Sequence, residues 1–294
     1  MPLLIPQNTS LYNILTYEGI CLINKYKFNK HIKPLKILIL NLMPTKLETE
    51  IQLLRVLGFS NHYIEITFLT TKTYISKNTS KEHLDMFYKT FDEIKDEYFD
   101  GMIITGAPVE HLDFEDVAYW NEFKNIMDYS YKNIKSTFHI CWAAQAGLYH
   151  HYGIKKYSLD EKVFGVFSHK SNNSYSKLLN GFDDEFFAPH SRYSYTKKED
   201  VEDLDDLEIL SESDEAGIYI IKSKDFKNIF VTGHSEYDSY TLYNEYKRDI
   251  DKNIDVQIPR NYFLDDNPNN NPIVKWRGHS NLLFYNWIKI LTSL

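Results

Sequence analysis

The sequence predicts an α/β fold that contains a parallel sheet and continues into a β-rich second half. Short apolar runs alternate with helical patterns in the first half of the chain, and short β-like segments dominate the second half. Residues 36–42 show the clearest run, which is apolar almost throughout and is typical of a strand buried on both faces. Strands that alternate with helices require right-handed crossovers, so these strands should run parallel.

The first half is expected to contain four strands, at residues 36–42, 63–69, 100–106 and 137–140. Helical patterns are found between them, at 45–57, in a longer charged region that reaches about 97, and at 114–131. Thr45 can cap the first of these helices, because Glu48 follows three residues later. The turn signal Gly106-Ala-Pro108 ends the third strand.

The second half has β-like segments at 162–167, 208–210, 217–221 and 228–232 and a closing amphipathic helix at 276–291. The acidic run at 199–206 is expected to be a solvated loop or a helix start, and 265–272 a polar loop. Because the sequence contains neither an internal repeat nor a clear linker, we expect residues 1–294 to form a single domain.

Composition excludes several classes of function. The chain has 294 residues and a net charge of −8 without a basic block, which argues against nucleic acid or an anionic membrane as its partner. Its cysteines, Cys21 and Cys141, are too few for a disulfide framework and suit a reducing cytoplasm. No run approaches the roughly 20 apolar residues of a membrane span, and the N-terminus does not resemble a signal peptide.

Cys141 is the strongest candidate for chemistry. It follows a short apolar strand and precedes the small, helix-forming residues Trp142-Ala-Ala-Gln-Ala146. A cysteine at such a strand-to-helix turn lies beside a helix N-terminus, which favours the thiolate, and the next backbone N–H, that of Trp142, can serve an oxyanion. We therefore expect an accessible side chain. The alternative, a buried core cysteine, stays open on local sequence alone.

A nucleophilic thiol needs a base, and His234 is the candidate. It follows a β-rich run in Gly233-His-Ser-Glu-Tyr-Asp238, and Glu236 lies on the same side of an extended chain. A carboxylate beside a histidine can fix its tautomer and stabilise the imidazolium. Taken alone, His234 could also be a structural histidine near a turn. The combined pattern favours a Cys–His–Glu site.

Other kinds of site have weaker support. The remaining histidines lack the ligand spacing of a zinc site, so no metal is expected. The first strand ends in Asn41-Leu-Met-Pro44, which lacks the glycines of a dinucleotide-binding loop.

Ordered motifs along nearly the whole chain resemble those of homoserine O-acyltransferases of the MetA type. They are Asn41-Leu-Met-Pro44, Glu48-Thr-Glu50, Thr105-Gly-Ala-Pro108, Val117-Ala-Tyr-Trp120, Cys141-Trp-Ala-Ala-Gln-Ala146, Pro189-His-Ser-Arg-Tyr193 and Gly233-His-Ser-Glu-Tyr-Asp238. The resemblance implies a flavodoxin-like parallel sheet flanked by helices, similar to class I glutamine amidotransferases. It also implies acyl transfer from an acyl-coenzyme A to the hydroxyl of L-homoserine, on the path to methionine.

The resemblance also implies roles for individual residues. Cys141 would be the nucleophile that becomes an acyl-thioester, His234 the general base and Glu236 its orienting acid, in a ping-pong reaction. Lys162, Ser191 and Arg248 would contact substrate, and a guanidinium suits the homoserine carboxylate. Each of these three, taken alone, could be an ordinary surface or turn residue. No cofactor is implied beyond acetyl-CoA as co-substrate, and a homodimer is left open.

The same resemblance implies that Glu110 occupies the position that sorts acyl donors in those enzymes, where glycine accompanies succinyl-CoA and glutamate accompanies acetyl-CoA. A carboxylate there would repel the free carboxylate of a succinyl group, so we expect acetyl-CoA as donor. The alternatives are a homoserine O-succinyltransferase, a cysteine amidohydrolase or glutaminase with the same triad, and a non-catalytic module with a structural Cys141. For Glu110 itself, the alternative to a role in donor selection is an exposed charge in a loop.

Overall fold

The computed structural model describes the whole chain except residues 1, 8, 30 and 74–78. Its strands are β1 (Leu3–Ile5), β2 (Leu22–Asn24), β3 (Leu35–Leu40), β4 (Ile64–Leu69), β5 (Tyr88–Lys89), β6 (Gly101–Ile104), β7 (Ser136–Ile140), β8 (Tyr157–Ser171), β9 (Glu185–Tyr195), β10 (Leu207–Ser213), β11 (Gly217–Ser223) and β12 (Asn228–Val231). Its α-helices are α1 (Ser10–Tyr17), α2 (Lys46–Leu57), α3 (Lys81–Phe87), α4 (Phe91–Ile94), α5 (Trp120–Asn133), α6 (Trp142–Tyr152), α7 (Lys198–Glu202), α8 (Thr241–Asp251) and α9 (Arg277–Ser293).

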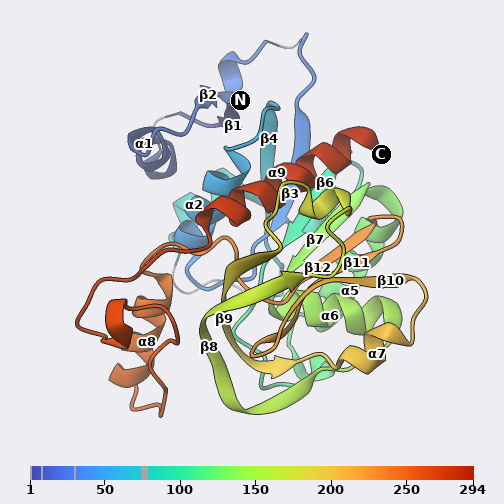
Figure 1. The fold of residues 1–294 in the computed structure, drawn as a ribbon. Helices are drawn as coiled ribbons and strands as arrows, with labels where there is room; N and C mark the ends of the chain where they lie inside the picture. The colour runs from blue at the N-terminus through green and yellow to red at the C-terminus, as the bar shows by residue number, and fades with distance from the viewer. Residues whose placement is uncertain (1, 8, 30, 74–78) are drawn as a thin grey trace.

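One sheet joins all the described strands in the order β2-β1-β4-β3-β6-β7-β12-β11-β10-β8-β9, with β5 beside β4 (Figure 1). Every pairing from β2 to β12 is parallel, and every pairing from β12 to β9 is antiparallel. The predicted α/β architecture with a β-rich second half is therefore confirmed.

Helices cover both faces of the parallel part, which explains why its strands are apolar on both sides. In β3, Ile37 and Ile39 pack in the core on the side of α2 and α9, whereas Leu38 and Leu40 pack in the core on the side of α5. Successive side chains of a strand point to opposite faces, so a strand between two helical layers needs an unbroken apolar run.

Some elements differ from the sequence-based expectation. The charged region that reaches residue 97 is not one helix: its described part contains the short helices α3 and α4, separated by β5. Thr45 occupies the N-cap position of α2 but makes no side-chain capping bond.

The sequence analysis also missed β1, α1, β2, β9 and α8. Pro189 makes β9 a poor strand by pattern, yet β9 is the last strand of the sheet, and proline is tolerated at an edge.

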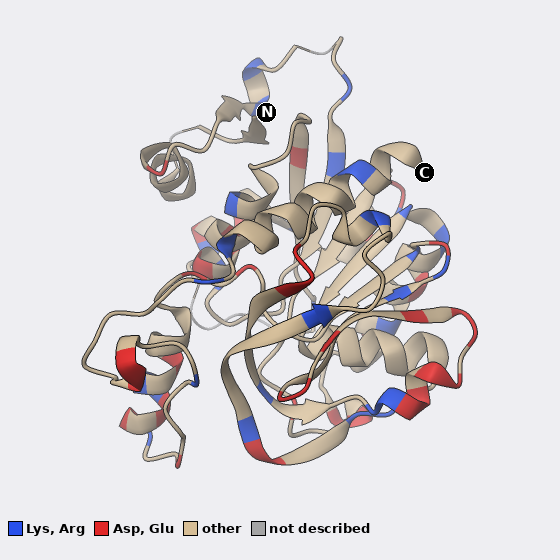
Figure 2. Ribbon diagram, viewed as in Figure 1, with Lys and Arg blue, Asp and Glu red and all other residues tan. Residues whose placement is uncertain are grey.

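Charged residues are distributed along the whole ribbon, and acidic residues are frequent around α7 and on α8 (Figure 2). The acidic run at 199–206 thus begins within a short helix, in agreement with one of the two expected structures. No helix in the described part of the chain is long and apolar enough to cross a membrane.

Candidate active site

Cys141 lies at the turn between β7 and α6, in a backbone conformation that side chains rarely adopt. Its φ of 53° and ψ of −116° fall outside the usual regions for a residue with a Cβ. Its backbone N–H still donates to Val231 O, 2.7 Å away, so the sheet holds the turn in place. Such strain persists where the surrounding structure imposes it, and it is common at active sites.

The Cys141 side chain is less accessible than the sequence suggested. The residue is only 8% exposed and touches the main core, so the expectation of an accessible thiol was wrong. The predicted helix start is correct: Trp142 is the first residue of α6, and Cys141 occupies the N-cap position directly before it. The Trp142 indole packs among core aromatic rings, so only its backbone could serve an oxyanion.

His234 lies beside Cys141 because their strands are neighbours. Strands β7 and β12 pair in parallel with Ile140 opposite Val231, so Cys141 and the residues after β12 extend from the same sheet edge. His234 Nδ1 lies 2.7 Å from Glu236 Oε1, which leaves Nε2 to face the thiol. The structure therefore brings the three predicted triad residues together.

The charges of this group favour a protonated imidazole. Burial opposes the charged form of His234, but Cys141 and Glu236 outweigh that effect, through their charge and their hydrogen bonds, and raise its pKa well above the ordinary value. A raised histidine pKa beside a thiol is typical of a thiolate–imidazolium pair. The Glu236 Oε2 atom is buried and has no partner among the described residues.

Gly106 lies against the reactive pair from the other side. It follows β6, which neighbours β7, and a Cβ at this position would lie 3.3 Å from Cys141 Cβ and 3.7 Å from His234 Cε1. A side chain here would therefore occupy the space next to the thiol. The sequence analysis had assigned this glycine only to a turn.

Glu110 is part of the same site and is not a free loop charge. Its Oε2 accepts from the Tyr193 backbone N–H at 2.9 Å. Burial raises its pKa above the ordinary value, while the Tyr193 hydrogen bond and the charges of Lys162, His234 and Arg192 reduce the rise. The carboxylate therefore lies within electrostatic range of the base.

Lys162, Ser191 and Arg248 come together around the acidic residues Glu245 and Asp249. Lys162 Nζ lies 3.1 Å from Asp249 Oδ2, and Ser191 Oγ donates to Glu245 Oε2. Arg248 Nε lies 2.8 Å from Asp249 Oδ1, and its side chain is 52% exposed. The predicted substrate residues thus form one polar group, although they lie on β8, β9 and α8.

The charges in this group stabilise one another. Burial would raise the pKa of Asp249, but the Arg248 hydrogen bond and the nearby Lys162 lower it overall. A buried carboxylate that contacts two cations is held ionised, so Asp249 fixes both side chains. We missed Glu245 and Asp249 in the sequence because they form part of an acidic and basic helix segment that is typical of a solvated surface.

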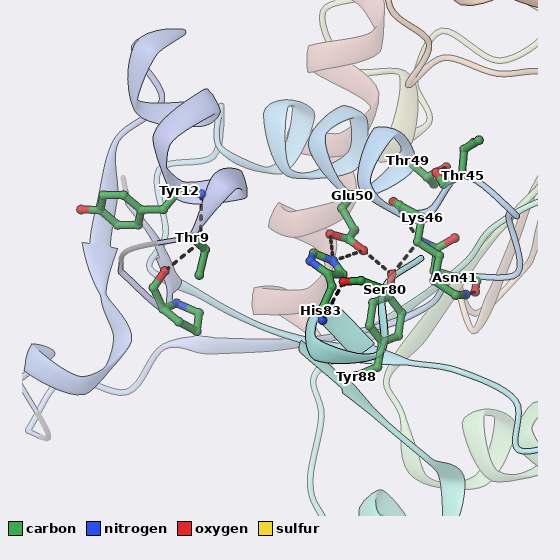
Figure 3. Close-up of polar contacts among 11 residues, drawn as sticks. Thr9, Tyr12, Asn41, Thr45, Lys46, Thr49, Glu50, Ser80, His83 and Tyr88 are labelled. Carbon is green, nitrogen blue, oxygen red and sulfur yellow. Dashed lines mark hydrogen bonds and ion pairs between the residues drawn. The ribbon is translucent and has the colours of Figure 1, made fainter. Parts of the chain in front are cut away.

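A buried polar cluster supports the loop that follows β3 (Figure 3). Glu50 accepts from Tyr88 OH at 2.5 Å and contacts His83 Nε2 at 2.9 Å, and Asn41 Nδ2 donates to the same hydroxyl. Lys46 Nζ donates to Asn41 O at 2.7 Å, and burial lowers the Lys46 pKa to about 8 although Glu50 opposes the change.

This loop is also tied to the turn that carries Gly106. The backbone N–H of Leu42 donates to Thr105 Oγ1 at 2.8 Å. The cluster therefore stabilises the sheet edge on which the thiol is placed. In the described residues, no group of three or more His, Cys, Asp or Glu side chains could hold a metal ion.

The arrangement can perform nucleophilic acyl chemistry, and the comparisons agree. The model of the homoserine O-succinyltransferase family matches residues 2–293. The chain belongs to this family. Its motifs had suggested the same family from the sequence, so that identification is confirmed.

Relatives named homoserine O-acetyltransferase match almost the full length. The protein from Acetivibrio thermocellus is 55% identical over 289 residues, covering 98% of this chain and 95% of the relative. The proteins from Clostridium acetobutylicum and Bacillus cereus are 55% and 50% identical to this chain. Each match also spans 289 residues, which is 98% of this chain and 96% of the relative.

Solved structures with this fold include a glutamine amidotransferase from Thermotoga maritima, with a TM-score of 0.58 and 12% identity over 88% of this chain and 99% of that one. A glutamine amidotransferase from Methylobacillus flagellatus gives a TM-score of 0.54 and 12% identity over 88% of this chain and 95% of that one. At such identity the likeness shows the fold alone, and it confirms the predicted similarity to glutamine amidotransferases.

Proposed function

We propose that this protein transfers an acetyl group from acetyl-CoA to the hydroxyl of L-homoserine, as a cytoplasmic, single-domain enzyme of methionine biosynthesis. The observation that carries the proposal is the position of Cys141, held on a strained turn between Gly106 and the His234–Glu236 pair. The names of its relatives support homoserine and acetyl-CoA as substrates.

In the first half-reaction the Cys141 thiolate attacks the thioester carbonyl of acetyl-CoA. His234 holds the thiol proton and Glu236 stabilises the imidazolium. The backbone N–H of Trp142 faces the developing oxyanion, and the proton goes to the departing coenzyme A thiolate. The products are acetyl-Cys141 and free coenzyme A.

In the second half-reaction homoserine binds near Lys162, Ser191 and Arg248, and the guanidinium pairs with its carboxylate. His234 removes the hydroxyl proton, the oxygen attacks the acetyl carbonyl, and the Cys141 thiolate leaves. His234 ends protonated beside that thiolate, so the resting pair is restored.

Intact-mass analysis tests the proposal. The protein is mixed with acetyl-CoA or succinyl-CoA without homoserine, and the modified residue is located by peptide mapping. We expect one acetyl group on Cys141, its removal by homoserine, and no modification of Cys141→Ala. Succinylation in preference to acetylation would favour the donor in the family's name, whereas glutamine hydrolysis without either modification would identify an amidohydrolase.

A further inference from the structure

Tyr237 lies flat against the catalytic imidazole. Its ring centroid is 4.0 Å from that of His234, with 16° between the planes. The residue is buried, and its own backbone is fixed, because its carbonyl accepts from Trp276 Nε1 at 2.9 Å. The hydrogen bond from Nδ1 to Glu236 alone would let the His234 imidazole tilt about that single contact. The stacked Tyr237 ring limits this tilt.

The far end of Tyr237 points toward the predicted homoserine-binding residues. Its hydroxyl donates to Glu245 Oε1 at 2.7 Å. The other oxygen of the same carboxylate accepts from Ser191 and lies 3.9 Å from Lys162 Nζ. Glu245 thus contacts the substrate residues with one oxygen and the partner of the base with the other.

We propose that Tyr237 and Glu245 form a positioning pair, which ties the orientation of the His234 imidazole to occupancy of the homoserine subsite. The homoserine part of this inference rests on the proposed function. The stack on His234 does not, because it concerns the thiol–imidazole pair itself.

The physical reason is that His234 must serve two partners, the thiol and then the homoserine hydroxyl. An imidazole that tilts by a small angle loses its hydrogen bond to either one. A substrate held by Ser191 and Lys162 would reorganise the carboxylate of Glu245, and the Tyr237 hydroxyl carries that change to the ring against His234. The aromatic face also stabilises the imidazolium.

Three variants separate these roles. Tyr237→Phe keeps the stacked ring and removes the bond to Glu245, whereas Tyr237→Leu removes both. Tyr129→Phe is the matched control, because Tyr129 is a buried tyrosine on α5 whose hydroxyl donates to Glu97 O at 2.9 Å and contacts none of the site residues. Alkylation of Cys141 by iodoacetamide as a function of pH, without substrates, measures the thiolate–imidazolium pair. Single-turnover transfer from acetyl-Cys141 to homoserine measures the second half-reaction.

We expect Tyr237→Leu to move the alkylation profile to higher pH by roughly half a unit or more. Tyr237→Phe should leave that profile unchanged and slow transfer to homoserine by about ten-fold, as the loss of one hydrogen bond to a charged group would. Tyr129→Phe should match the wild type in both assays.

The inference is overturned if Tyr237→Leu keeps the wild-type alkylation profile, or if Tyr237→Phe and Tyr129→Phe slow transfer equally. Alkylation needs neither substrate, so it tests the stack even if acetyl-CoA fails to acylate the wild-type protein. That failure would refute the proposed function alone.

Discussion

The backbone N–H of Tyr193 donates to the Glu110 carboxylate at 2.9 Å, and this bond holds the acid at the proposed acyl site, within electrostatic range of His234. A succinyl group would bring a second carboxylate to the same place. Repulsion between two carboxylates in a partly desolvated site costs on the order of 1–3 kcal/mol, about ten- to a hundred-fold in specificity. We therefore expect Glu110→Gly to raise the succinyl-CoA to acetyl-CoA ratio of kcat/KM by about that factor.

Glu110→Gln separates charge from size, because it keeps the shape and removes the charge. If charge repulsion excludes the succinyl group, Glu110→Gln should use succinyl-CoA nearly as well as Glu110→Gly does. If the size of the side chain excludes it, only Glu110→Gly should gain succinyl-CoA use. A wild-type protein that already prefers succinyl-CoA would disprove the role of Glu110.

Cys141→Gly should be more stable than Cys141→Ala, which reverses the usual order of these residues. The φ of 53° and ψ of −116° strain any residue with a Cβ, and such strain costs about 1–3 kcal/mol. Both variants should lose acyl transfer, because both lack the thiol. Urea unfolding of the two variants measures the difference, and a more stable Ala variant would show that the turn is not strained.

Gly106→Ala should slow acylation by about ten-fold or more while the protein stays folded, because the new Cβ would crowd Cys141 and fill the space beside its thiol. Gly278→Ala is the control, since a Cβ there would meet open space. Acylation rates by intact mass and circular dichroism of both variants make the comparison. Wild-type acylation by Gly106→Ala would remove this glycine from the site.

Arg248→Ala should raise the KM for homoserine strongly and leave Cys141 acylation unchanged. The guanidinium takes no part in the first half-reaction, and the loss of a charge-assisted contact costs about ten-fold or more in affinity. Lys247→Ala, at the adjacent position on α8, serves as the control for a general effect of alanine on that helix. Equal homoserine kinetics in both variants would exclude Arg248 from substrate binding.

The buried histidines His139 and His169 and the half-buried His151 should make the fold acid-sensitive. Burial lowers the pKa of His139 and His169 to about 3 and that of His151 to about 4. The unfolded chain protonates these rings near pH 6.5, so below that pH it binds more protons than the folded chain. The free energy of unfolding should therefore fall as pH decreases from about 6.5, by up to about 1.4 kcal/mol per pH unit for each ring.

Replacing one of these rings tests this effect. His151→Gln should reduce the slope of unfolding free energy against pH between about 6.5 and 4, whereas His31→Gln, at an exposed site, should not. Urea unfolding at several pH values gives both slopes. Identical slopes for His151→Gln and the wild type would contradict the explanation by histidine desolvation.

The sequence by itself determined much of the core. The apolar run at 36–42 predicted β3, and the change from an apolar strand to small helix formers predicted the turn at Cys141. The short spacing of His234 and Glu236 also predicted their contact. These features depend on residues close in the chain, where the periodicity of a single element is informative.

Only the tertiary structure decided which distant residues meet. Glu245 belongs to a charged segment, α8, that the sequence did not reveal as a helix, yet its contacts with Ser191 and Tyr237 make it part of the site. Gly106 looks like a turn residue, and only the order of β6, β7 and β12 places it against Cys141. The same order buries the thiol that we expected to be accessible. Strand order and helix docking depend on packing over the whole chain, and no local pattern encodes them.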